Sequence, residues 1–485
     1  VVTMLVKNPD SDEHGAIHYH DIGDYLTRDE KLSIVREAAQ GEAFDWETLS
    51  PDRHGDWLNQ RDDSWYEFAP LGVEKGKKPF GIFKNWSSGV KTNRDPWAIN
   101  YSSEKVSQNM RDMTDVFNAE IERWTSAGMP DNIDAFVDSD ETKIKWTREL
   151  KKDLRLKKTG CFEEEGIRPV SYRPFCSQTI YLNRQMNNCV YQIPQIFPER
   201  SCANLYIATT GGQKPAVLIS NKIPDFHFVG DTQCFPLYWY ERQESLGGLF
   251  GEESGEYVQQ EAITDKALEV FRSVYPRVFD AFGKRKPRPK NQGGIEITKE
   301  DIFYYIYGIL HSPEYRERFG SNLKKELPRI PLAEDFVAFS NAGRNLAKLH
   351  LDYEDLEPWP VEEVGEATDP GPVKKIKWAK KRNPSTGKKE NDYTTLIYND
   401  NLTIRDIPAA AQRYVVNGRS PIDWVIDRYQ VKTDGPSGIT NDPNDYSDDP
   451  RYIIDLIEKL VRVSMETMEI VDSLPALKEK PQPAD

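Results

Sequence analysis

The sequence predicts a mixed α/β protein built from several subdomains, and three observations support this prediction. Apolar residues recur at helical spacing in the segments 27–39, 102–124 and 298–311, and again near the end of the chain. Between residues 167 and 241, short β-rich runs such as VSYRPFCSQTIYL and CFPLYWYE alternate with Gly, Pro and Asn. With 485 residues, the chain is longer than a typical single domain, so about two to four domains are expected.

The N-terminal segment is predicted to hold two strands followed by a helix. The opening stretch VVTMLVKNPD is rich in apolar and β-branched residues, as buried strands are, and AIHYHDIGDYL alternates well enough for a second strand. The helix TRDEKLSIVREAA begins with Thr27 and Glu30 in capping-box spacing and places Leu32 and Val35 on one face. A buried strand at the start raises the question of where the rest of its sheet lies.

The next two hundred residues change character twice. Residues 41–100 are rich in Trp, Asp and turn residues, and they predict loops. Helical spacing returns at 102–124, and the charged segment 140–154 predicts a further helix. In the β-rich centre, Gly211 and Gly212 follow a strand, and no helix start comes after them, so they predict a hairpin turn and not a phosphate-binding loop.

The C-terminal half is predicted to be mainly helical. Residues 243–261 are rich in Gly, Glu and Ser and predict a linker. In ITKEDIFYYIYGILHS, which starts at Thr298 and Asp301, the tyrosines share a face with Ile and Leu, which favours core packing over base stacking. A basic loop between possible strands is predicted at 374–389, and a closing amphipathic helix from Arg451.

Composition excludes several classes of protein. The net charge of −15 argues against a protein coated with phosphate-binding cations, although a local basic patch remains compatible with it. No apolar run approaches the roughly 20 residues that span a bilayer. The cysteines form no C-x-x-C pair and are odd in number, and no signal peptide is evident, which predicts a protein of the reducing cytoplasm; they are Cys161, Cys176, Cys189, Cys202 and Cys234.

Motifs for catalysis and for metal binding are absent or weak. The sequence has no G-x-G-x-x-G after a strand, no G-x-x-x-x-G-K-[ST] and no G-x-S-x-G. His18 and His20 would point to the same side of a strand, as metal ligands can, but a pair of half-exposed strand histidines explains them more simply. NDPNDYSDDP lacks the order of ligands found in calcium loops, which favours a surface loop.

Three basic segments could contact nucleic acid. They are KRKPRPK at 284–290, the run from Lys374 to Lys389, and KNWSSGVKTNRDPW at 84–97. Lys, Arg, Asn and Thr side chains contact phosphates and base edges. An ordinary solvated loop is the alternative for each segment, and the residue types alone do not decide between the two.

Several long segments are specific enough to suggest a family. They are ITKEDIFYYIYGILHSPEYRERFGSNLKKELPRIPLAEDFVAFSNAGRNLAKLHLDYE, YRPFCSQTIYL, TQCFPLYWYE, AAQRYVVNGRSPIDWVIDRYQVKTDGPSGITNDPNDY and the final helix with its LPAL. Together they resemble the C-terminal specificity region of type ISP restriction–modification enzymes and their helicase–methyltransferase relatives, over roughly residues 165–475. Residues 1–125 resemble the last strands of the family's methyltransferase domain and the passage into target recognition.

The resemblance implies a division into three parts. Residues 1–125 would be the trailing edge of an adenine methyltransferase-like domain, 126–242 a mixed, β-rich part of the target-recognition domain, and 262–485 its largely helical C-terminal part. It also implies that VVTMLVKNPD is a sheet strand whose neighbours lie upstream.

The resemblance implies no catalytic, cofactor-binding or metal-binding residue in this chain. The family's methyltransferase uses an Asn-Pro-Pro-aromatic motif and a Gly-containing loop for S-adenosylmethionine, and neither occurs here, since KNPD and RNPS lack the second Pro and the aromatic residue. S-adenosylmethionine, and ATP with Mg²⁺, are therefore expected only in upstream domains.

The function implied is sequence-specific binding of duplex DNA that presents an adenine to a methyltransferase core absent from this chain. A G-x-x-T-x-x-D-like stretch at Gly89, Thr92 and Asp95 marks the passage into target recognition. The DNA-contacting residues implied are Lys91, Thr92, Asn93, Arg94, Arg173, Lys284, Arg285, Lys286, Arg288, Lys380, Lys381, Arg382 and Arg419. Arg344 is expected to be structural. The alternative is a protein-interaction module that docks on a separate methyltransferase or helicase subunit and has little DNA affinity of its own.

Overall fold

The structure is a computed structural model that describes most of the chain, in two compact units. The described residues are 7, 9–10, 15–23, 26–39, 45–58, 60–73, 81–210, 215–243, 256–275, 278–279, 285–286, 296–384 and 387–481, with the backbone alone at 38–39, 278–279 and 285–286. One unit comprises residues 1–65 and the other residues 66–485. Each unit is described by itself below. The predicted opening strand, at residues 1–6, lies outside the described residues.

The first unit contains a two-stranded antiparallel sheet and one helix. Strand β1 (Ile17–Tyr19) pairs with β2 (Glu47–Leu49), and α1 (Arg28–Ala39) lies between them in sequence. The strand predicted from AIHYHDIGDYL is therefore confirmed, although it is only three residues long.

The capping box predicted for α1 is confirmed. The Thr27 backbone N–H donates to Glu30 Oε2 at 2.6 Å, and the Glu30 N–H donates to Thr27 Oγ1 at 3.3 Å. Leu32 and Val35, however, are 41% and 46% exposed. Helical spacing places them on one face, but only a packing partner can bury that face.

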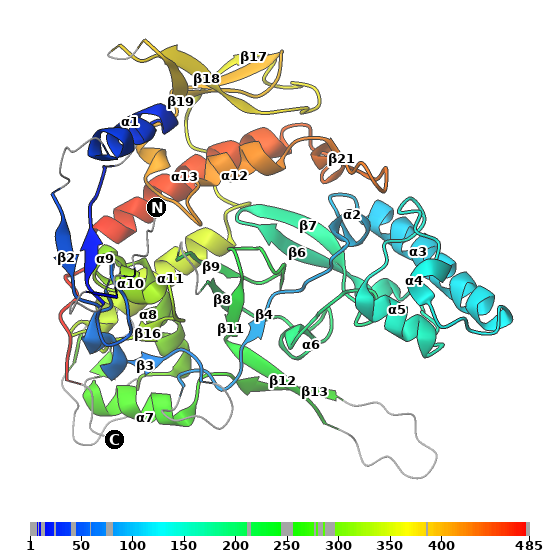
Figure 1. Cartoon of the computed structure of the whole chain (residues 1–485), viewed down its shortest axis with the longest axis horizontal. Helices are drawn as coiled ribbons and strands as arrows, with labels where there is room; N and C mark the ends of the chain where they lie inside the picture. The colour runs from blue at the N-terminus through cyan, green and yellow to red at the C-terminus, as the bar shows by residue number, and fades with distance from the viewer. Residues whose placement is uncertain are drawn as a thin grey trace. The chain divides into compact units, whose positions relative to one another are not determined.

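Two four-stranded sheets lie in the second unit (Figure 1). The first has the order β10-β6-β7-β5 and is antiparallel except for the parallel pair of β10 and β6, whereas the second has the order β4-β11-β8-β9 and is antiparallel throughout. These strands confirm the predicted β-rich centre. They are β4 (Ser87–Ser88), β5 (Ile99–Asn100), β6 (Ile167–Arg173), β7 (Cys176–Tyr181), β8 (Tyr206–Thr209), β9 (Val217–Ser220), β10 (Ile223–Pro224) and β11 (Gln233–Pro236).

Two hairpins follow from the pairing of neighbouring strands. Strands β8 and β9 are antiparallel with Thr209 opposite Val217, which confirms the predicted hairpin, although Gly211 and Gly212 themselves lie outside the described residues. Strand β12 (Tyr238–Gln243) pairs with β13 (Glu256–Glu261). The prediction of a linker over 243–261 is therefore wrong at its C-terminal end, because the backbone there finds a partner in β12 that composition does not reveal.

Helices α3 (Ser103–Ser126), α4 (Ile133–Phe136) and α5 (Arg148–Arg155) lie together beside β6 and β7, as Figure 1 shows, and share one hydrophobic cluster with them. Helix α3 confirms the helix predicted at 102–124. The helix predicted at 140–154 is wrong in its first half. Helix α5 begins after Thr147, whose side chain accepts a hydrogen bond from the Leu150 N–H, whereas the Asp140 carboxylate stabilises a turn by accepting from the Thr142 N–H.

The C-terminal half is largely helical, as predicted. Helix α8 has a capping box between Thr298 and Asp301, and Tyr305 and Tyr307 are fully buried in the core, as their spacing predicted. Arg344 lies 2.7 Å from Asp301 and acts in structure, as expected. The longer helices are α7 (Asp265–Val274), α8 (Lys299–His311), α9 (Pro313–Arg318), α11 (Phe336–Leu351), α12 (Pro421–Arg428) and α13 (Tyr452–Asp472).

A third four-stranded antiparallel sheet has the order β17-β20-β19-β18 and lies beside α12 and α13 in Figure 1. Its strands are β17 (Glu362–Gly365), β18 (Lys377–Arg382), β19 (Lys389–Ile397) and β20 (Leu402–Arg405). The basic loop predicted at 374–389 is therefore partly wrong: Lys380, Lys381 and Arg382 lie on a strand, because β19 pairs with them. Shorter elements include β3 (Ala69–Pro70), β14 (Val278–Phe279), β15 (Arg285–Lys286), β16 (Arg329–Ile330), β21 (Lys432–Thr433), β22 (Thr440–Asn441), α2 (Asp95–Ala98), α6 (Ile193–Ile196) and α10 (Gly320–Leu323).

One hydrophobic core connects the three large sheets with the C-terminal helices. Val170 on β6, Leu218 on β9, Leu396 on β19 and Leu460 on α13 belong to the same cluster and are at most 3% exposed. This continuity fixes the loops between the sheets relative to one another. In the described ranges, no helix combines the length and the apolar character needed to span a bilayer.

Candidate nucleic-acid interface

The predicted loop from Lys91 to Arg94 is held in place by its backbone. Lys91 exchanges hydrogen bonds of 2.8 and 2.9 Å with Cys189, and the Val90 N–H donates to the Pro224 carbonyl at 2.8 Å. A Cβ on Gly89 would lie 2.4 Å from the Asp225 carbonyl oxygen, so only glycine permits this approach. The loop is therefore positioned by three neighbouring segments.

The side chains of this loop alternate between surface and interior. Asn93 is exposed and adopts the left-handed conformation, with φ of 54°, while Lys91 is half-buried. Thr92 is buried and donates from Oγ1 to Asp95. Of the four predicted DNA contacts in this loop, only Lys91 and Asn93 have side chains at the surface.

Arg94 points into the protein and is only 2% exposed. Its Nη2 donates to Thr147 Oγ1 at 2.9 Å. Burial lowers the pKa of Arg94 to about 10, so the guanidinium stays protonated at neutral pH. A DNA contact by Arg94 would therefore have to be made below the surface.

Arg173 is joined to the same loop through a buried ion pair. Its Nη1 donates to Asp225 Oδ1 at 2.6 Å, with side-chain exposures of 11% and 3%. Its guanidinium also stacks 4.0 Å from the ring of Tyr172, whose hydroxyl donates to Asp95 at 3.2 Å. Burial raises the pKa of Asp225 to about 7, although Arg173 acts in the opposite direction.

Two adjoining cavities open beside this loop. The first, which we name the loop cavity, has a volume of about 340 Å³ and is lined by Lys91, Thr92, Asn93, Arg94, Asp95, Pro96, Trp97, Glu141, Lys145, Asp225, Phe226, His227, Asp434, Pro436 and Ser437. The second, the hairpin cavity, has about 310 Å³ and lies against β21 and β22. Both cavities are lined by Asp95, Pro96 and Asp434, so they form one continuous hollow.

Arg419 is connected to the hairpin cavity through Asp427. Arg419 Nη1 lies 2.7 Å from Asp427 Oδ2, and its guanidinium lies 5.0 Å from the Trp424 ring centre. Asp427 and Arg428 both line the hairpin cavity. The structure thus brings Lys91–Arg94, Arg173 and Arg419 close to one hollow, although they are far apart in sequence.

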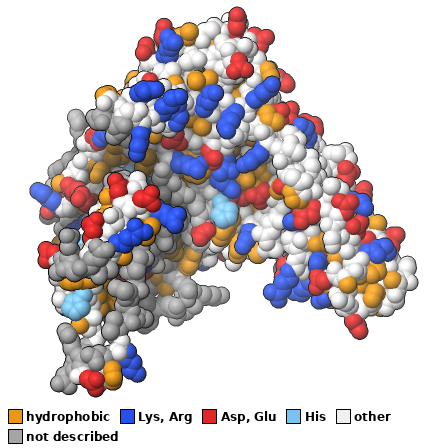
Figure 2. All heavy atoms as spheres, turned by 45° about the horizontal axis from the view of Figure 1, so that its top comes forward, with side chains coloured by type: hydrophobic (Ala, Val, Ile, Leu, Met, Phe, Trp, Pro, Cys, Tyr) orange, Lys and Arg blue, Asp and Glu red, His pale blue; other side chains and the backbone are white. Residues whose placement is uncertain are grey.

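The predicted residues on β18 lie elsewhere and are exposed. Lys380 Nζ donates to Asn391 Oδ1 at 2.5 Å, and Lys381 Nζ lies 3.7 Å from Asp392. Neither they nor Arg382 line the loop or hairpin cavity. Figure 2 shows many Lys and Arg side chains gathered on the face that includes this sheet.

The predicted basic segment at 284–290 cannot be assessed in the same way. Lys284 and Arg288 lie outside the described residues, and Arg285 and Lys286 are described only as backbone of β15. Their DNA contacts stay predictions.

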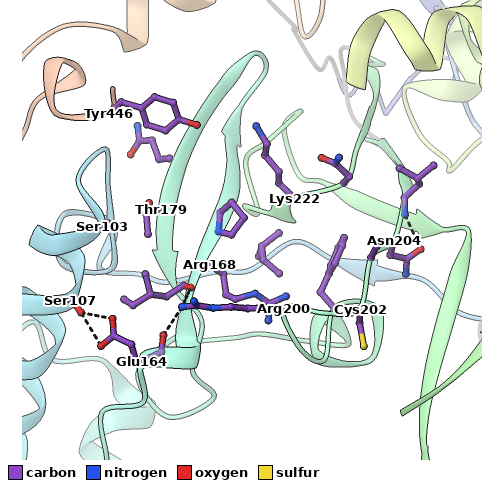
Figure 3. A pocket seen from close by; sticks show the side chains of 18 of the residues that line it. Ser103, Ser107, Glu164, Arg168, Thr179, Arg200, Cys202, Asn204, Lys222 and Tyr446 are labelled. Carbon is purple, nitrogen blue, oxygen red and sulfur yellow. Dashed lines mark hydrogen bonds between the residues drawn. The ribbon is translucent and has the colours of Figure 1, made fainter. Parts of the chain in front are cut away.

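A larger cavity, of about 1190 Å³, lies between α3, β6 and the segment after α6 (Figure 3). Its arginines are largely occupied by the protein: Arg200 donates to the carbonyls of Glu164 and Ile167 at 2.8 and 2.7 Å, and Arg168 donates to that of Glu199 at 3.0 Å. Figure 3 shows Arg168 and Arg200 side by side at the lower edge of this cavity. None of the predicted DNA-binding residues lines it.

Sequence reasoning missed several members of the loop cavity. Lys145, His227 and Asp434 come from three separate segments, and no spacing in the sequence connects them with Lys91. Among the described residues, no group of three His, Cys, Asp or Glu side chains is arranged for a metal ion. His18 Nδ1 lies 3.4 Å from Thr48 Oγ1, and His20 Nδ1 lies 2.9 Å from the Asp45 carbonyl oxygen.

Comparisons with known proteins place this fold. The sequence profile of a family described as the Type ISP C-terminal specificity domain matches residues 81–456. No curated protein matches the chain significantly in sequence. Among solved structures, a nuclease-deletion mutant of the Type ISP restriction-modification enzyme LlaGI, in complex with a DNA substrate mimic, is 37% identical with a TM-score of 0.78; the match covers 97% of this chain and 40% of that one.

Two further solved structures match over nearly the whole chain. The ATP-dependent Type ISP restriction-modification enzyme LlaBIII, bound to DNA, is 31% identical with a TM-score of 0.77, and the match covers 98% of this chain and 28% of that one. A DrdV–DNA complex is 28% identical with a TM-score of 0.75, covering 96% and 44%. This chain therefore spans less than half the length of each. The mixed α/β fold is confirmed, and because the family profile matches more than three quarters of the sequence, the chain belongs to the family of Type ISP C-terminal specificity domains.

Proposed function

We propose that this chain is the DNA target-recognition part of a longer Type ISP restriction–modification enzyme. It binds duplex DNA in a sequence-dependent way and presents an adenine to a methyltransferase core outside this chain. The observation that supports this proposal most strongly is the family match over residues 81–456, joined with structural likeness to a LlaGI mutant in complex with a DNA substrate mimic and to LlaBIII bound to DNA. The activity of the whole enzyme is part of the proposal.

Two surfaces divide the work of binding in this proposal. Lys91 and Asn93, at the mouth of the loop cavity, contact base edges, because an amide can bond adenine and an ammonium can bond guanine in the major groove. The exposed cations on β18, Lys380, Lys381 and Arg382, contact backbone phosphates, which add affinity and no sequence preference. Such a division is compatible with an overall charge of −15, because only local charge meets the DNA.

The proposal assigns S-adenosylmethionine, ATP and Mg²⁺ to the parts of the enzyme outside this chain. The donors and acceptors around the loop cavity do not fit S-adenosylmethionine, because the four carboxylates that line it are engaged by side chains or backbone groups of the protein itself. No step of methyl transfer is therefore derived for these residues.

The experiment that tests the function is selection from a random duplex pool. The 485-residue chain is incubated with the pool over a series of salt concentrations, and the retained DNA is sequenced. We expect one enriched motif and an affinity that falls with salt, with a slope of about 0.9 for each phosphate neutralised. Weak retention with no enriched motif would reject the DNA reader in favour of the protein-interaction module.

A pair of variants separates base reading from folding. Asn93→Gly removes the amide but tolerates a positive φ, so the loop is expected to keep its shape while the enriched motif loses preference at one position. Lys324→Gln, on an exposed residue just after α10, is the control and should retain the wild-type motif. An unchanged motif in Asn93→Gly would remove that residue from the proposed interface.

A further inference from the structure

Three side-chain N–H donors at the loop cavity have no acceptor. They are Nε and Nη1 of Arg94 and Nε1 of Trp97, and none has a hydrogen-bond partner among the residues that the structure describes. Both residues line the loop cavity, and they are only 2% and 5% exposed. Buried donors are almost always paired in folded proteins, so three orphans at one cavity need an explanation.

The acidic side chains around the cavity do not supply the missing acceptor. Asp95 accepts from the hydroxyls of Thr92 and Tyr172, and Asp225 accepts from Arg173 and from the His227 N–H. Glu141 pairs with Lys145.

The fourth carboxylate that lines the cavity, Asp434, accepts from the Ser437 N–H and Oγ at 3.0 and 2.7 Å. The described structure thus gives every cavity carboxylate a donor of its own and leaves Arg94 with a single bond, to Thr147.

An unpaired buried cation is costly, and Arg94 remains charged because its pKa stays near 10. The cost falls if an anion enters the cavity. Two further cations, Lys91 and Lys145, line the same cavity, and the guanidinium is bonded to Thr147, which caps the N-terminus of the eight-residue helix α5. Positive charge therefore dominates beside the orphan donors.

We propose that the loop cavity binds one backbone phosphate of the DNA through the side chains of Arg94 and Trp97. A non-bridging phosphate oxygen accepts from two guanidinium N–H groups or from one together with the indole, which matches the fork geometry that arginine offers to phosphates. A base edge would present donors as well as acceptors, whereas the orphan groups are all donors. The assignment rests on the proposed function, and it makes Arg94 an anchor below the surface while Asn93 stands at the mouth.

Neutral phosphates at single positions test this site. Duplexes of the selected sequence are prepared with one methylphosphonate at each position in turn, and their affinities for the wild-type chain are measured. We expect one position at which the loss of charge weakens binding by about tenfold or more. In Arg94→Met and Trp97→Phe, binding to the unmodified duplex weakens and the penalty at that position shrinks toward unity, because the contact is already lost.

The controls distinguish this site from a general loss of structure. Trp146→Phe removes an indole N–H that is already bonded to the Asp138 carbonyl, so it should keep the wild-type methylphosphonate profile. Trp97→Phe keeps an aromatic ring in place and guards against misfolding of Arg94→Met. A profile that is the same in wild type, Arg94→Met and Trp97→Phe would overturn the phosphate site, leave DNA binding intact and point to bound water. No binding by the wild-type chain would instead overturn the proposed function and the site with it.

Discussion

The loop cavity and the β18 strand both contain cations that the sequence predicts as DNA contacts, but the structure uses them differently. At the loop, Arg94 and Arg173 are 2% and 11% exposed and are bonded to Thr147 and Asp225. On β18, Lys380, Lys381 and Arg382 are exposed. Charge fixed in the interior can hold a group in one geometry, whereas charge on a long solvated side chain acts over distance and is screened by salt.

The largest difference between the two regions is expected in stability. Replacing Arg173 by Met leaves Asp225 buried without its partner, and breaking such a pair costs about 3–5 kcal/mol. We expect urea unfolding of Arg173→Met to show a loss of this order. Arg382→Met on β18 is the matched control and should change the free energy of unfolding by less than about 0.5 kcal/mol. Similar losses in the two variants would mean that burial does not separate the regions.

The pH dependence of stability should also separate them. Burial raises the pKa of Asp225 to about 7 in the folded chain, above its value of about 3.9 in an unfolded chain. The folded state therefore binds this proton more tightly, so the stability it contributes is complete below about pH 4 and is lost as pH rises toward 7.

The measurement compares urea unfolding of wild type and Asp225→Asn between pH 5 and 8. Relative to the variant, the wild type is expected to lose about 1.4 kcal/mol for each pH unit until the carboxyl is ionised. Asp392→Asn, beside β18, is the control: bonds from Thr394 lower the pKa of Asp392, so its curve should run parallel to wild type in this range. Parallel curves for all three proteins would contradict the assignment to Asp225.

The β18 cations are expected to matter for affinity and not for folding. Combined replacement of Lys380, Lys381 and Arg382 by Gln should weaken binding to every sequence by about tenfold and lower the salt slope by about 3. Binding is measured against salt for the selected duplex and for an unrelated one. Gln at the exposed Lys266, Lys324 and Lys325, on or next to α7 and α10, makes the same charge change and should leave the slope unaltered. A loss confined to the selected duplex would move these residues to base reading.

The smallest effect concerns the backbone of the loop. Asn93 has φ of 54°, a conformation that costs most residues about 1–2 kcal/mol and Asn less. Asn93→Ala is therefore expected to lower the free energy of unfolding by about 1 kcal/mol, while Asn93→Gly stays within about 0.5 kcal/mol. Asn391→Ala, on the extended strand β19, should resemble the Gly variant. A stable Asn93→Ala protein would show that the loop is free to adopt another shape.

Sequence periodicity predicted the long elements well and the short or charged ones poorly. Helices α3 and α8 were placed correctly, because their apolar residues repeat over several turns and begin at capping residues. The segment 140–154 is helical only from Arg148, since Thr147 and Asp140 bond the local backbone in a way that charge patterning does not reveal. Strands β13 and β18 exist because of their partners, and pairing is a property of two segments.

The candidate site shows the same limit. The sequence identified Lys91, Asn93, Arg94 and Arg173 by residue type and family resemblance. It did not place Arg94 in the interior, and it did not join Arg173 to Asp225. Whether each predicted contact meets DNA stays a prediction, as does the division into parts at 1–125, 126–242 and 262–485.

The sequence alone determined the family, the mixed α/β class and the longest helices, because these depend on residue types at short and regular spacing. Tertiary structure alone decided which cations are buried, which carboxylate pairs with each of them, and that the donors of Arg94 and Trp97 share one cavity without an acceptor. The physical reason is that burial and pairing depend on neighbours contributed by distant segments, such as Thr147 and Asp225, and the cost of a buried charge is set only when those neighbours are in place.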